Sequence, residues 1–232
     1  MDARSYLSKV GLTVDVAAIR EAQQGLWGVL DEAKKASLPA TPSALNALYQ
    51  YKVPKLSPDG SCSLHEELDP KPYDLGLVLG GRSIQNSFAL ITLDALVEFV
   101  QQQIGCEWLG IYQRRELASG AALVKLAFRG AHSRAEFPLN DDFAKSSNNV
   151  AVALSGQARV LQDIQAHVAS GGAYYECDPK VQSEACLPVL DPNGKVVGLI
   201  DAESQKANHF GPAAMAALVA LATECPSHFP PR

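Results

Sequence analysis

Apolar residues in the central part of the chain recur first at helical spacing and then in short continuous runs. Between Ile84 and Ile104 they follow one helical stripe, and Gly105 comes directly after its last member. This pattern predicts a long amphipathic helix that ends at the glycine. The segments EWLGIY, residues 107–112, and ALVKLAF, residues 122–128, are short and mainly apolar, which predicts two strands.

The last third of the chain carries a strong hairpin signal. Residues 183–190 and 195–203 flank Asp-Pro-Asn-Gly at 191–194, a combination typical of a tight turn between antiparallel strands. Pro188 lies inside the first of these strands and has no N–H, so we expect the strand edge on that side to be unpaired. Gly211-Pro212 opens a final alanine-rich helix. The other segments are predicted as a polar loop at 140–149, a short strand at 159–161 and a flexible break at 170–172.

The first 80 residues have a different pattern from the rest. A helical stripe from Asp15 to Ala36 predicts a helix with Thr13 as its N-cap, and Thr41-Pro42 predicts a second helix that runs to about Tyr51. Residues 52–74 are rich in proline and read as a linker. We therefore expect a helical extension with a Pro-rich linker over residues 1–80, of unknown function, and a second domain over residues 81–232. The gathered strands with helices at both ends predict an α+β fold in which terminal helices cover an antiparallel sheet.

Composition and charge limit the classes of function. Of the 232 residues, 47% are apolar and 19% are charged, which is typical of a globular protein, and the net charge is -5. The acidic balance argues against nucleic-acid binding and against a basic membrane surface. The longest apolar run, 213–222, is too short to span a bilayer, and the first residues lack the apolar core of a signal peptide. We expect a cytoplasmic protein with no membrane or nucleic-acid partner.

The cysteines give one candidate nucleophile. None of the five lies in a C-x-x-C pair or at zinc-site spacing, so no metal is expected. Cys177 follows two glycines and precedes a proline, which places it on an exposed loop where a thiol can react. Its acidic neighbours Glu176 and Asp178 act against reactivity because they raise a thiol pKa. An inert cysteine is the alternative interpretation.

The hairpin also carries three acidic residues. Because side chains alternate along a strand, Asp201 and Glu203 share one face, and so do Glu184 and Cys186 on the partner strand. Acids at strand ends are most often solvated. If these acids instead line a pocket, they bind an ammonium group or hold a proton at neutral pH, because crowded carboxylates raise one another's pKa.

These residues form a recognisable motif. Cys177-Asp178, Ser183-Glu184 and Leu187-Pro188, followed by GLIDAES at 198–204, closely resemble C-D-x-x-x-x-S-E-x-x-L-P and G-V-L-D-I-D-S of the GAF-fold free methionine-(R)-sulfoxide reductases. The segment WLGIY at 108–112 resembles the W-x-G-F-Y strand of that family. The resemblance covers residues 84–228. It implies a six-stranded antiparallel sheet flanked by helices, with a small-molecule pocket on one side.

The resemblance also implies roles for single residues. Cys177 attacks the sulfoxide sulfur, and Glu184, Asp201 and Glu203 orient the substrate and protonate the sulfoxide oxygen. Trp108 and Tyr112 pack against the S-methyl group, and Ser183 is placed among the substrate-binding residues. Methionine leaves, Cys177 becomes a sulfenic acid, and a thioredoxin-type thiol reductant regenerates it without a cofactor. The family also implies a homodimer.

Two stretches depart from the family in a way that keeps other functions open. The family carries further cysteines, used in resolving and relay chemistry, where this chain has residues 133–138 and 148–151, and neither stretch contains one. Cys186 and Cys62 are the candidate resolving thiols, and an external thiol is the alternative. The rival interpretation is a non-catalytic GAF module that binds a small ligand, because one fold hosts both functions. A third is a redox sensor in which Cys177 pairs with another cysteine.

Overall fold

The computed structural model describes residues 1–38, 41–56 and 67–231. Its strands are β1 (Gln50–Tyr51), β2 (Tyr73–Asp74), β3 (Trp108–Leu117), β4 (Gly120–Arg129), β5 (Glu136–Pro138), β6 (Arg159–Leu161), β7 (Ser183–Leu190) and β8 (Val196–Ser204). Its helices are α1 (Ala3–Val10), α2 (Val16–Ala33), α3 (Pro42–Tyr49), α4 (Leu75–Val78), α5 (Ile84–Ile104), α6 (Asp141–Ala144), α7 (Asn148–Ser155), α8 (Ile164–Ala169) and α9 (Pro212–Glu224), followed by the 3-10 turn η1 (Cys225–His228).

Six of the strands form one antiparallel sheet in the order β5-β4-β3-β8-β7-β6, which confirms the predicted architecture. Two hairpins form its centre. β3 and β4 turn at Gly120, where φ is 113°, and β7 and β8 turn through the predicted Asp-Pro-Asn-Gly segment, with Gly194 at φ 83°. These values lie in the left-handed region, which glycine adopts without steric cost. β1 and β2 form a separate two-stranded ribbon.

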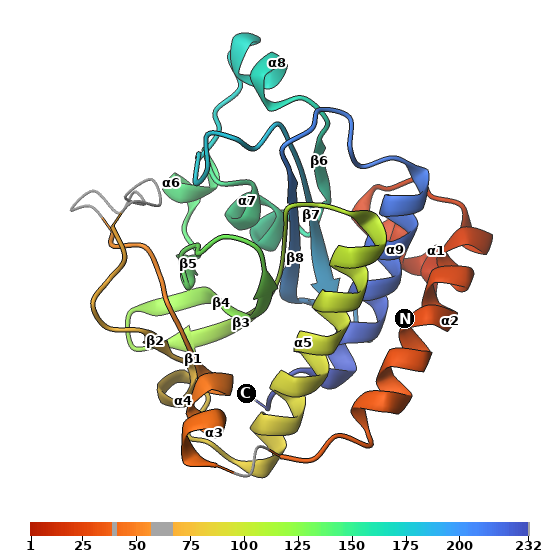
Figure 1. Ribbon diagram of the computed structural model, residues 1–232. Coiled ribbons are helices and arrows are strands. Elements are labelled where there is room, and N and C mark those ends of the chain that lie inside the picture. The colour runs from red at the N-terminus through yellow and green to blue at the C-terminus, as the bar shows by residue number, and fades with distance from the viewer. Residues whose placement is uncertain (39–40, 57–66, 232) are drawn as a thin grey trace.

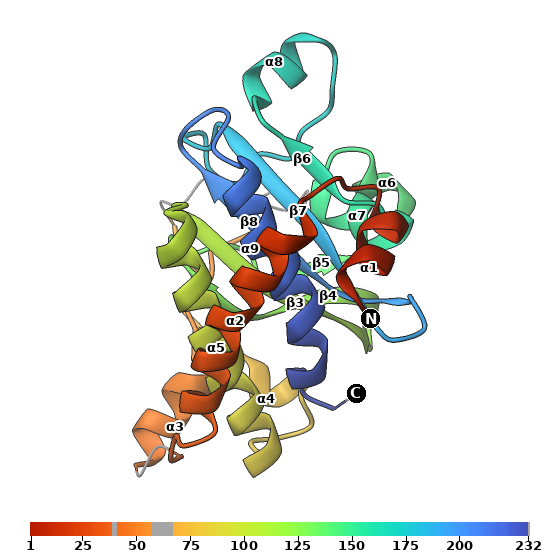
Figure 2. The ribbon, with the colours of Figure 1, turned by 90° about the vertical axis from the view of Figure 1, so that its right-hand side faces the viewer.

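The two faces of the six-stranded sheet are covered differently. Helices α5, α9 and α2 lie on one face, whereas α6 and α7 lie on the other (Figures 1 and 2). The larger apolar cluster joins α2, α5 and α9 to the sheet. Within it, α9 contributes an almost continuous set of buried residues. Alanine at Ala216, Ala217 and Ala220 keeps α9 narrow, so it packs closely against α2 and α5.

The N-terminal helices belong to this core. α2 runs beside α9 (Figure 2), and Ile19 and Leu26 are buried in the same cluster as the sheet residues. The predicted cap at Thr13 is wrong, because the carboxylate of Asp15 accepts the N–H of Ala17 at 3.0 Å and α2 begins one residue later. The short helix α1 was not expected from the sequence. Its N-cap is Asp2, whose carboxylate accepts the N–H of Ser5.

α1 also explains the proline in β7. The Tyr6 hydroxyl donates to the carbonyl oxygen of Pro188 at 2.8 Å. The N and C=O of one strand residue point to the same side, so the Pro188 nitrogen faces α1 and not the partner strand β8. The short edge strand β6 pairs only with residues 184–186 and ends before this position. The expectation of an unpaired edge beside Pro188 is confirmed, and a side chain from the N-terminal extension covers it.

The predicted loop at 140–149 is wrong, because this segment forms α6 and the start of α7. Its polar residues are helix caps. Asn140 Oδ1 accepts the N–H of Phe143 at 2.8 Å, and Ser147 Oγ accepts the N–H of Val150 at 3.3 Å. Polar residues at such spacing satisfy the first N–H groups of short helices, so their polarity alone does not indicate a loop.

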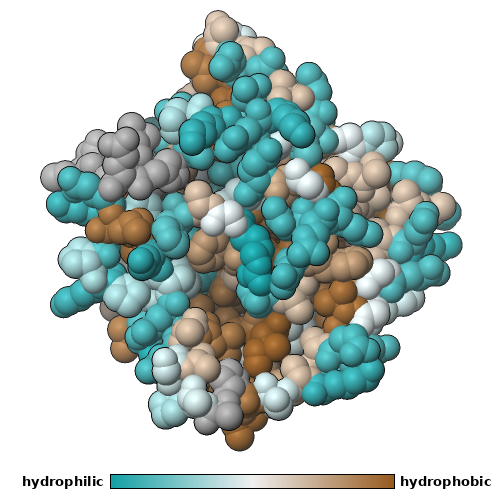
Figure 3. All heavy atoms as spheres, in the orientation of Figure 1, coloured by the Kyte–Doolittle hydropathy of each residue, from teal (hydrophilic) through white to brown (hydrophobic). Residues whose placement is uncertain are grey.

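The surface seen in Figure 3 is mainly polar, and its apolar side chains gather toward the lower part of that view. Large apolar side chains that are exposed in the described residues include Trp27, Leu77 and Ile84. Within the part of the chain that the structure describes, no helix has the length and apolar character needed to cross a membrane.

Candidate functional site

The four hairpin residues singled out by the sequence lie on one face of the sheet. In the β7–β8 register, Glu184 is opposite Glu203 and Cys186 is opposite Asp201. Residues opposite each other in an antiparallel pair point to the same side, so the two predicted pairs combine into one cluster of three carboxyl groups and a thiol. The cluster faces α7 and not the large apolar core.

Two asparagines at the start of α7 cover the cluster. Asn148 Nδ2 donates to Glu184 Oε2, and Asn149 Nδ2 donates to Asp201 Oδ2 at 2.9 Å. Asn148 is only 3% exposed, and its Oδ1 has no hydrogen-bond partner among the described residues. The Ser147 cap aims the first turn of α7 at the sheet, and thereby brings both amides to the carboxyl groups. These contacts could not be predicted from the sequence, because both asparagines fall in the polar segment 140–149, which was expected to be a loop.

The Cys186 thiol lies between the acidic side chains. Its Sγ is 3.2 Å from Glu184 Oε1, 3.6 Å from Asp201 Oδ1 and 3.3 Å from Asn149 Oδ1. Burial, and next the charge of Glu184, raise the pKa of Cys186 well above its usual value, so it is a neutral thiol and a poor nucleophile near pH 7. The prediction that Cys186 resolves a sulfenic acid stays a prediction.

Burial also raises the pKa values of the three carboxyl groups. It raises the pKa of Glu184, although the hydrogen bond from Asn148 acts in the opposite direction. Burial and then the charge of Glu184 raise the pKa of Asp201 well above its usual value, and burial and then the charge of Asp201 do the same for Glu203. Burial therefore favours the protonated form of these carboxyl groups, and a carboxyl group that holds its proton can act as an acid.

An aromatic wall stands next to the acids. Trp108 is opposite Glu203 in the β3–β8 register, and its indole N–H donates to the Ala131 carbonyl at 3.0 Å. A Cβ at Gly110 would lie 2.2 Å from the indole ring, so only glycine at this position allows the ring to lie flat along the strand. Tyr112 is buried beside it, with ring centroids 6.3 Å apart.

Cys177 joins this group from the loop before β7, as the sequence predicted. It is partly exposed and lines two small cavities. The inner cavity has a volume of about 20 Å³. It is bordered by Cys177, by the three carboxyl groups of the cluster and by aromatic and amide side chains: Glu184, Asp201, Glu203, Trp108, Tyr112, Asn148 and Asn149. The outer cavity, of about 90 Å³, shares with it Trp108, Ser133, Cys177 and Glu203. The inner space is enough for one water molecule.

Two other residues were predicted for the site: Ser183 points away from it, and Cys62 is not among the residues that the structure describes. Ser183 precedes Glu184 and therefore points to the opposite face, where its hydroxyl donates to the Lys206 carbonyl at 2.7 Å. It lines neither cavity, and its role in substrate binding stays a prediction. Cys62 falls in the segment 57–66, outside the described residues.

Two buried cations next to the site were not found from the sequence. Lys125 in β4 is 0% exposed, and its ammonium group lies 3.9 Å from the ring centroid of Phe128. Arg134 is 5% exposed and lies between aromatic rings, with Nη1 donating to the Tyr175 hydroxyl at 3.0 Å. One signal was available for Lys125, since a lysine inside the apolar run ALVKLAF is unusual for a buried strand.

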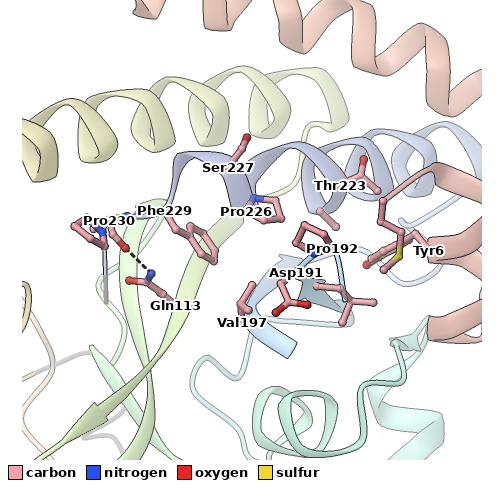
Figure 4. Close-up of a pocket in the computed structure, with 14 residues that line it drawn as sticks. Tyr6, Gln113, Asp191, Pro192, Val197, Thr223, Pro226, Ser227, Phe229 and Pro230 are labelled. Carbon is pink, nitrogen blue, oxygen red and sulfur yellow. Dashed lines mark hydrogen bonds between the residues drawn. The ribbon is translucent and has the colours of Figure 1, made fainter. Parts of the chain in front are cut away.

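Two further features of the structure have the form of a metal or ligand site. Glu184, Cys186 and Asp201 offer three donor atoms within 4.8 Å of one another, and we assign them to the hydrogen-bond network described above because each takes part in it. A roomier cavity of about 380 Å³ lies at the opposite end of the sheet, between Tyr6, Pro192 and Phe229 (Figure 4). No cysteine and no predicted site residue lines this cavity, so size alone does not make it the reactive site.

Comparison with known proteins agrees with the fold. The GAF domain family model matches residues 90–225, more than half of the chain. A type II free methionine-R-sulfoxide reductase from Thermoplasma acidophilum is 23% identical with a TM-score of 0.50, covering 61% of this chain and 94% of that one. The free methionine-R-sulfoxide reductase of Neisseria meningitidis, solved in complex with its substrate, is 21% identical with a TM-score of 0.51, covering 66% and 86%.

Another GAF domain has a similar TM-score at lower sequence identity. The GAF domain of a phosphoenolpyruvate-protein phosphotransferase from Coxiella burnetii is 13% identical with a TM-score of 0.50, covering 60% of this chain and 81% of that one. A search of curated proteins gave no match. An antiparallel sheet with long helices on one face, and with a polar pocket under α6 and α7 on the other, defines the class of an α+β domain. The chain belongs to the GAF domain family. At these identities the solved structures show the fold alone.

Proposed function

We propose that the protein reduces the (R)-sulfoxide of free methionine, with Cys177 as the nucleophile. One observation carries this proposal: Cys177 borders the same cavity as Glu184, Asp201 and Glu203, with Trp108 and Tyr112 as its apolar wall. Sulfoxide reduction needs a soft nucleophile for sulfur and an acid for oxygen. The cavity offers both within one enclosed space. The similarity to two reductases of this activity supports the proposal through the fold.

The proposed reaction has two stages. The Cys177 thiolate attacks the sulfoxide sulfur while protonated carboxyl groups of the cluster donate to the sulfoxide oxygen. The oxygen then passes from the methionine sulfur to the Cys177 sulfur, as the S–O bond of the substrate and the S–S bond formed in the attack both break. Methionine leaves, and Cys177 is left as a sulfenic acid. Two external thiols then reduce the sulfenic acid to the thiol, giving one disulfide and one water molecule. Trp108 and Tyr112 contact the S-methyl group, and exclude water from the reacting sulfur.

The test is methionine release from L-methionine-(R)-sulfoxide with dithiothreitol, for wild type, Cys177→Ser and Cys225→Ala. Cys225 is buried in the helical core away from the cavity, so its variant controls for the loss of a thiol. Turnover in wild type and Cys225→Ala, with none in Cys177→Ser, supports the proposal. No turnover in wild type, or equal turnover in Cys177→Ser, contradicts it. A parallel assay with thioredoxin examines the natural reductant.

A second candidate is a non-catalytic GAF module that binds a small ligand. The observation in its favour is the small inner cavity of about 20 Å³, where the amides of Asn148 and Asn149 already bond two of the three carboxyl groups. The same assay separates the two functions. Binding of methionine sulfoxide by calorimetry without any turnover identifies the binding module.

A further inference from the structure

Lys125 is the charged residue most completely enclosed beside the site. It is 0% exposed, and three aromatic rings surround its ammonium group, with Nζ 3.9 Å from the ring centroid of Phe128, 5.0 Å from Tyr51 and 5.7 Å from Trp108. Such rings stabilise a cation through their π faces. A buried charge is nevertheless costly unless polar groups or counter-charges surround it. Its position therefore calls for a function beyond packing.

The ammonium group of Lys125 reaches the cavities through hydrogen bonds to Ser133. Nζ donates to the Ser133 carbonyl oxygen at 2.8 Å and to Ser133 Oγ at 2.7 Å. Ser133 lines both the inner and the outer cavity beside Cys177. Because Oγ accepts from the ammonium group, its own proton is available as a donor toward the cavities. A hydroxyl that accepts from a cation is also a stronger donor than an isolated one.

The rest of the inner cavity has the opposite polarity. Its acceptors are the three carboxyl groups and Asn148 Oδ1, which is buried and has no partner among the described residues. The space beside Cys177 therefore has an acceptor-rich wall at α7 and β8, and a donor wall at Ser133. A ligand with both a donor group and an anionic group matches this arrangement. One hydroxyl and one buried ammonium match a single negative charge.

We propose that Ser133, supported by Lys125, binds a carboxylate of the ligand beside Cys177. Ser133 contacts the carboxylate, and Lys125 is a positioning residue that acts through Ser133. The ligand class is a small zwitterion, with its ammonium group toward the carboxyl cluster and its carboxylate toward Ser133. The identification of this ligand as a free amino acid rests on the proposed function. The donor wall itself does not depend on any reduction step.

The test uses two alkylating agents of nearly equal size that differ in charge. Iodoacetate carries a carboxylate and iodoacetamide a neutral amide, and both react with the same Cys177 thiolate. The ratio of their rate constants at Cys177, measured by peptide mass spectrometry, therefore cancels any change in thiol pKa. We expect Ser133→Ala and Lys125→Met to lower the ratio of iodoacetate to iodoacetamide by about tenfold, the effect of one hydrogen bond to a charged group. Lys125→Arg keeps the ratio within about threefold of wild type, because the positive charge remains.

Matched controls separate local from general effects. Lys52→Met removes a positive charge from an exposed residue near the site, and Ser227→Ala removes a hydroxyl far from it; both leave the ratio unchanged. An unchanged ratio in Ser133→Ala overturns the proposal. An equal fall of the ratio in Lys125→Met and Lys52→Met also overturns the proposal, because such a result would come from long-range electrostatic attraction and not from the contact with Ser133. If Lys125→Met fails to fold, Ser133→Ala decides.

The alkylation ratio is independent of catalysis, so the two proposals fail separately. A protein without sulfoxide turnover that shows the predicted ratios retains the carboxylate site and loses the reductase function. A protein with turnover whose ratios do not respond to Ser133 retains the reductase function and loses the carboxylate site. In an active protein, Ser133→Ala is further expected to raise KM for the free amino acid more than it lowers kcat.

Discussion

The two faces of the central hairpin use the same strands for different purposes. On β7, Ala185 and Leu187 point into the large core beneath α9, whereas Glu184 and Cys186 point toward α7. One face is apolar and closely covered by long helices, and supplies most of the stability through buried area. The other holds three carboxyl groups, of which those of Glu184 and Asp201 are buried, and their enclosure costs free energy. Alternation along a strand therefore allows a stable core to support a site that is itself unfavourable for folding.

The largest effect that separates the faces is expected from Cys177→Ser. The loss of the nucleophile lowers turnover of methionine sulfoxide by about a thousandfold or more. Among the described residues no other thiol lines the cavity, and burial raises the pKa of the neighbouring Cys186 thiol well above its usual value. Stability is unaffected, since Cys177 is a partly exposed loop residue. The measurements are initial rates and urea denaturation. A variant that loses stability and activity together would mean that Cys177 is structural.

The converse change is Leu218→Ala on α9. Leu218 is fully buried in the core on the other face, so the variant creates a cavity and costs about 2–5 kcal/mol of unfolding free energy. Turnover per folded molecule stays the same, because the sheet separates Leu218 from Cys177. Urea denaturation gives the stability, and rates are measured well below the transition. A large change in turnover of the folded variant would show that the two faces are coupled.

The comparison is sharpened by Asp201→Asn, which keeps the shape and removes one carboxyl group. Turnover falls by about a hundredfold if Asp201 supplies a proton. Burial raises the folded-state pKa of Asp201 above its usual value of 3.8, so its contribution to stability is present below that pH and is lost as the pH rises through the folded pKa. The wild type therefore loses stability relative to Asp201→Asn as the pH rises above 3.8 and through the raised folded-state pKa. Urea denaturation over a series of pH values tests this, and a constant difference between the two proteins would contradict the raised pKa.

The sequence predicted the hairpin and α5 well because their signals are local. Asp-Pro-Asn-Gly fixes the β7–β8 turn, and Gly105 ends α5 in the left-handed conformation. Alternation then placed Glu184, Cys186, Asp201 and Glu203 on one face correctly. The motif, and not periodicity, brought Cys177 and Trp108 into the same site.

The contacts that close the site could not be predicted, because they join residues far apart in the chain. Asn148 reaches Glu184 across 36 positions, and Arg134 reaches Tyr175 across 41. Lys125 was visible as a charge in an apolar strand, but its partner Ser133 lies beyond the end of that strand and is reached only in the folded chain. The caps of α6 and α7 were visible locally as Asn140 and Ser147, but their polarity predicted a loop and not the start of a helix.

The smallest expected effect concerns the N-terminal extension, through Tyr6→Phe. The variant removes the hydroxyl that donates to the Pro188 carbonyl at 2.8 Å, and leaves that carbonyl at the edge of β7 without this donor. One such hydrogen bond contributes about 1 kcal/mol to the free energy of unfolding, and the phenyl ring keeps the remaining contacts. Pro188 lies beyond the reach of β6, so no strand replaces the lost partner.

Turnover and the alkylation ratio at Cys177 stay at wild-type values, because Tyr6 packs at the other end of the hairpin beside Asp191 and Pro192 (Figure 4). Differential scanning calorimetry measures the stability change. A Tyr6→Phe protein of unchanged stability would mean that α1 is held by its apolar contacts alone, and one with altered turnover would mean that the extension acts on the site.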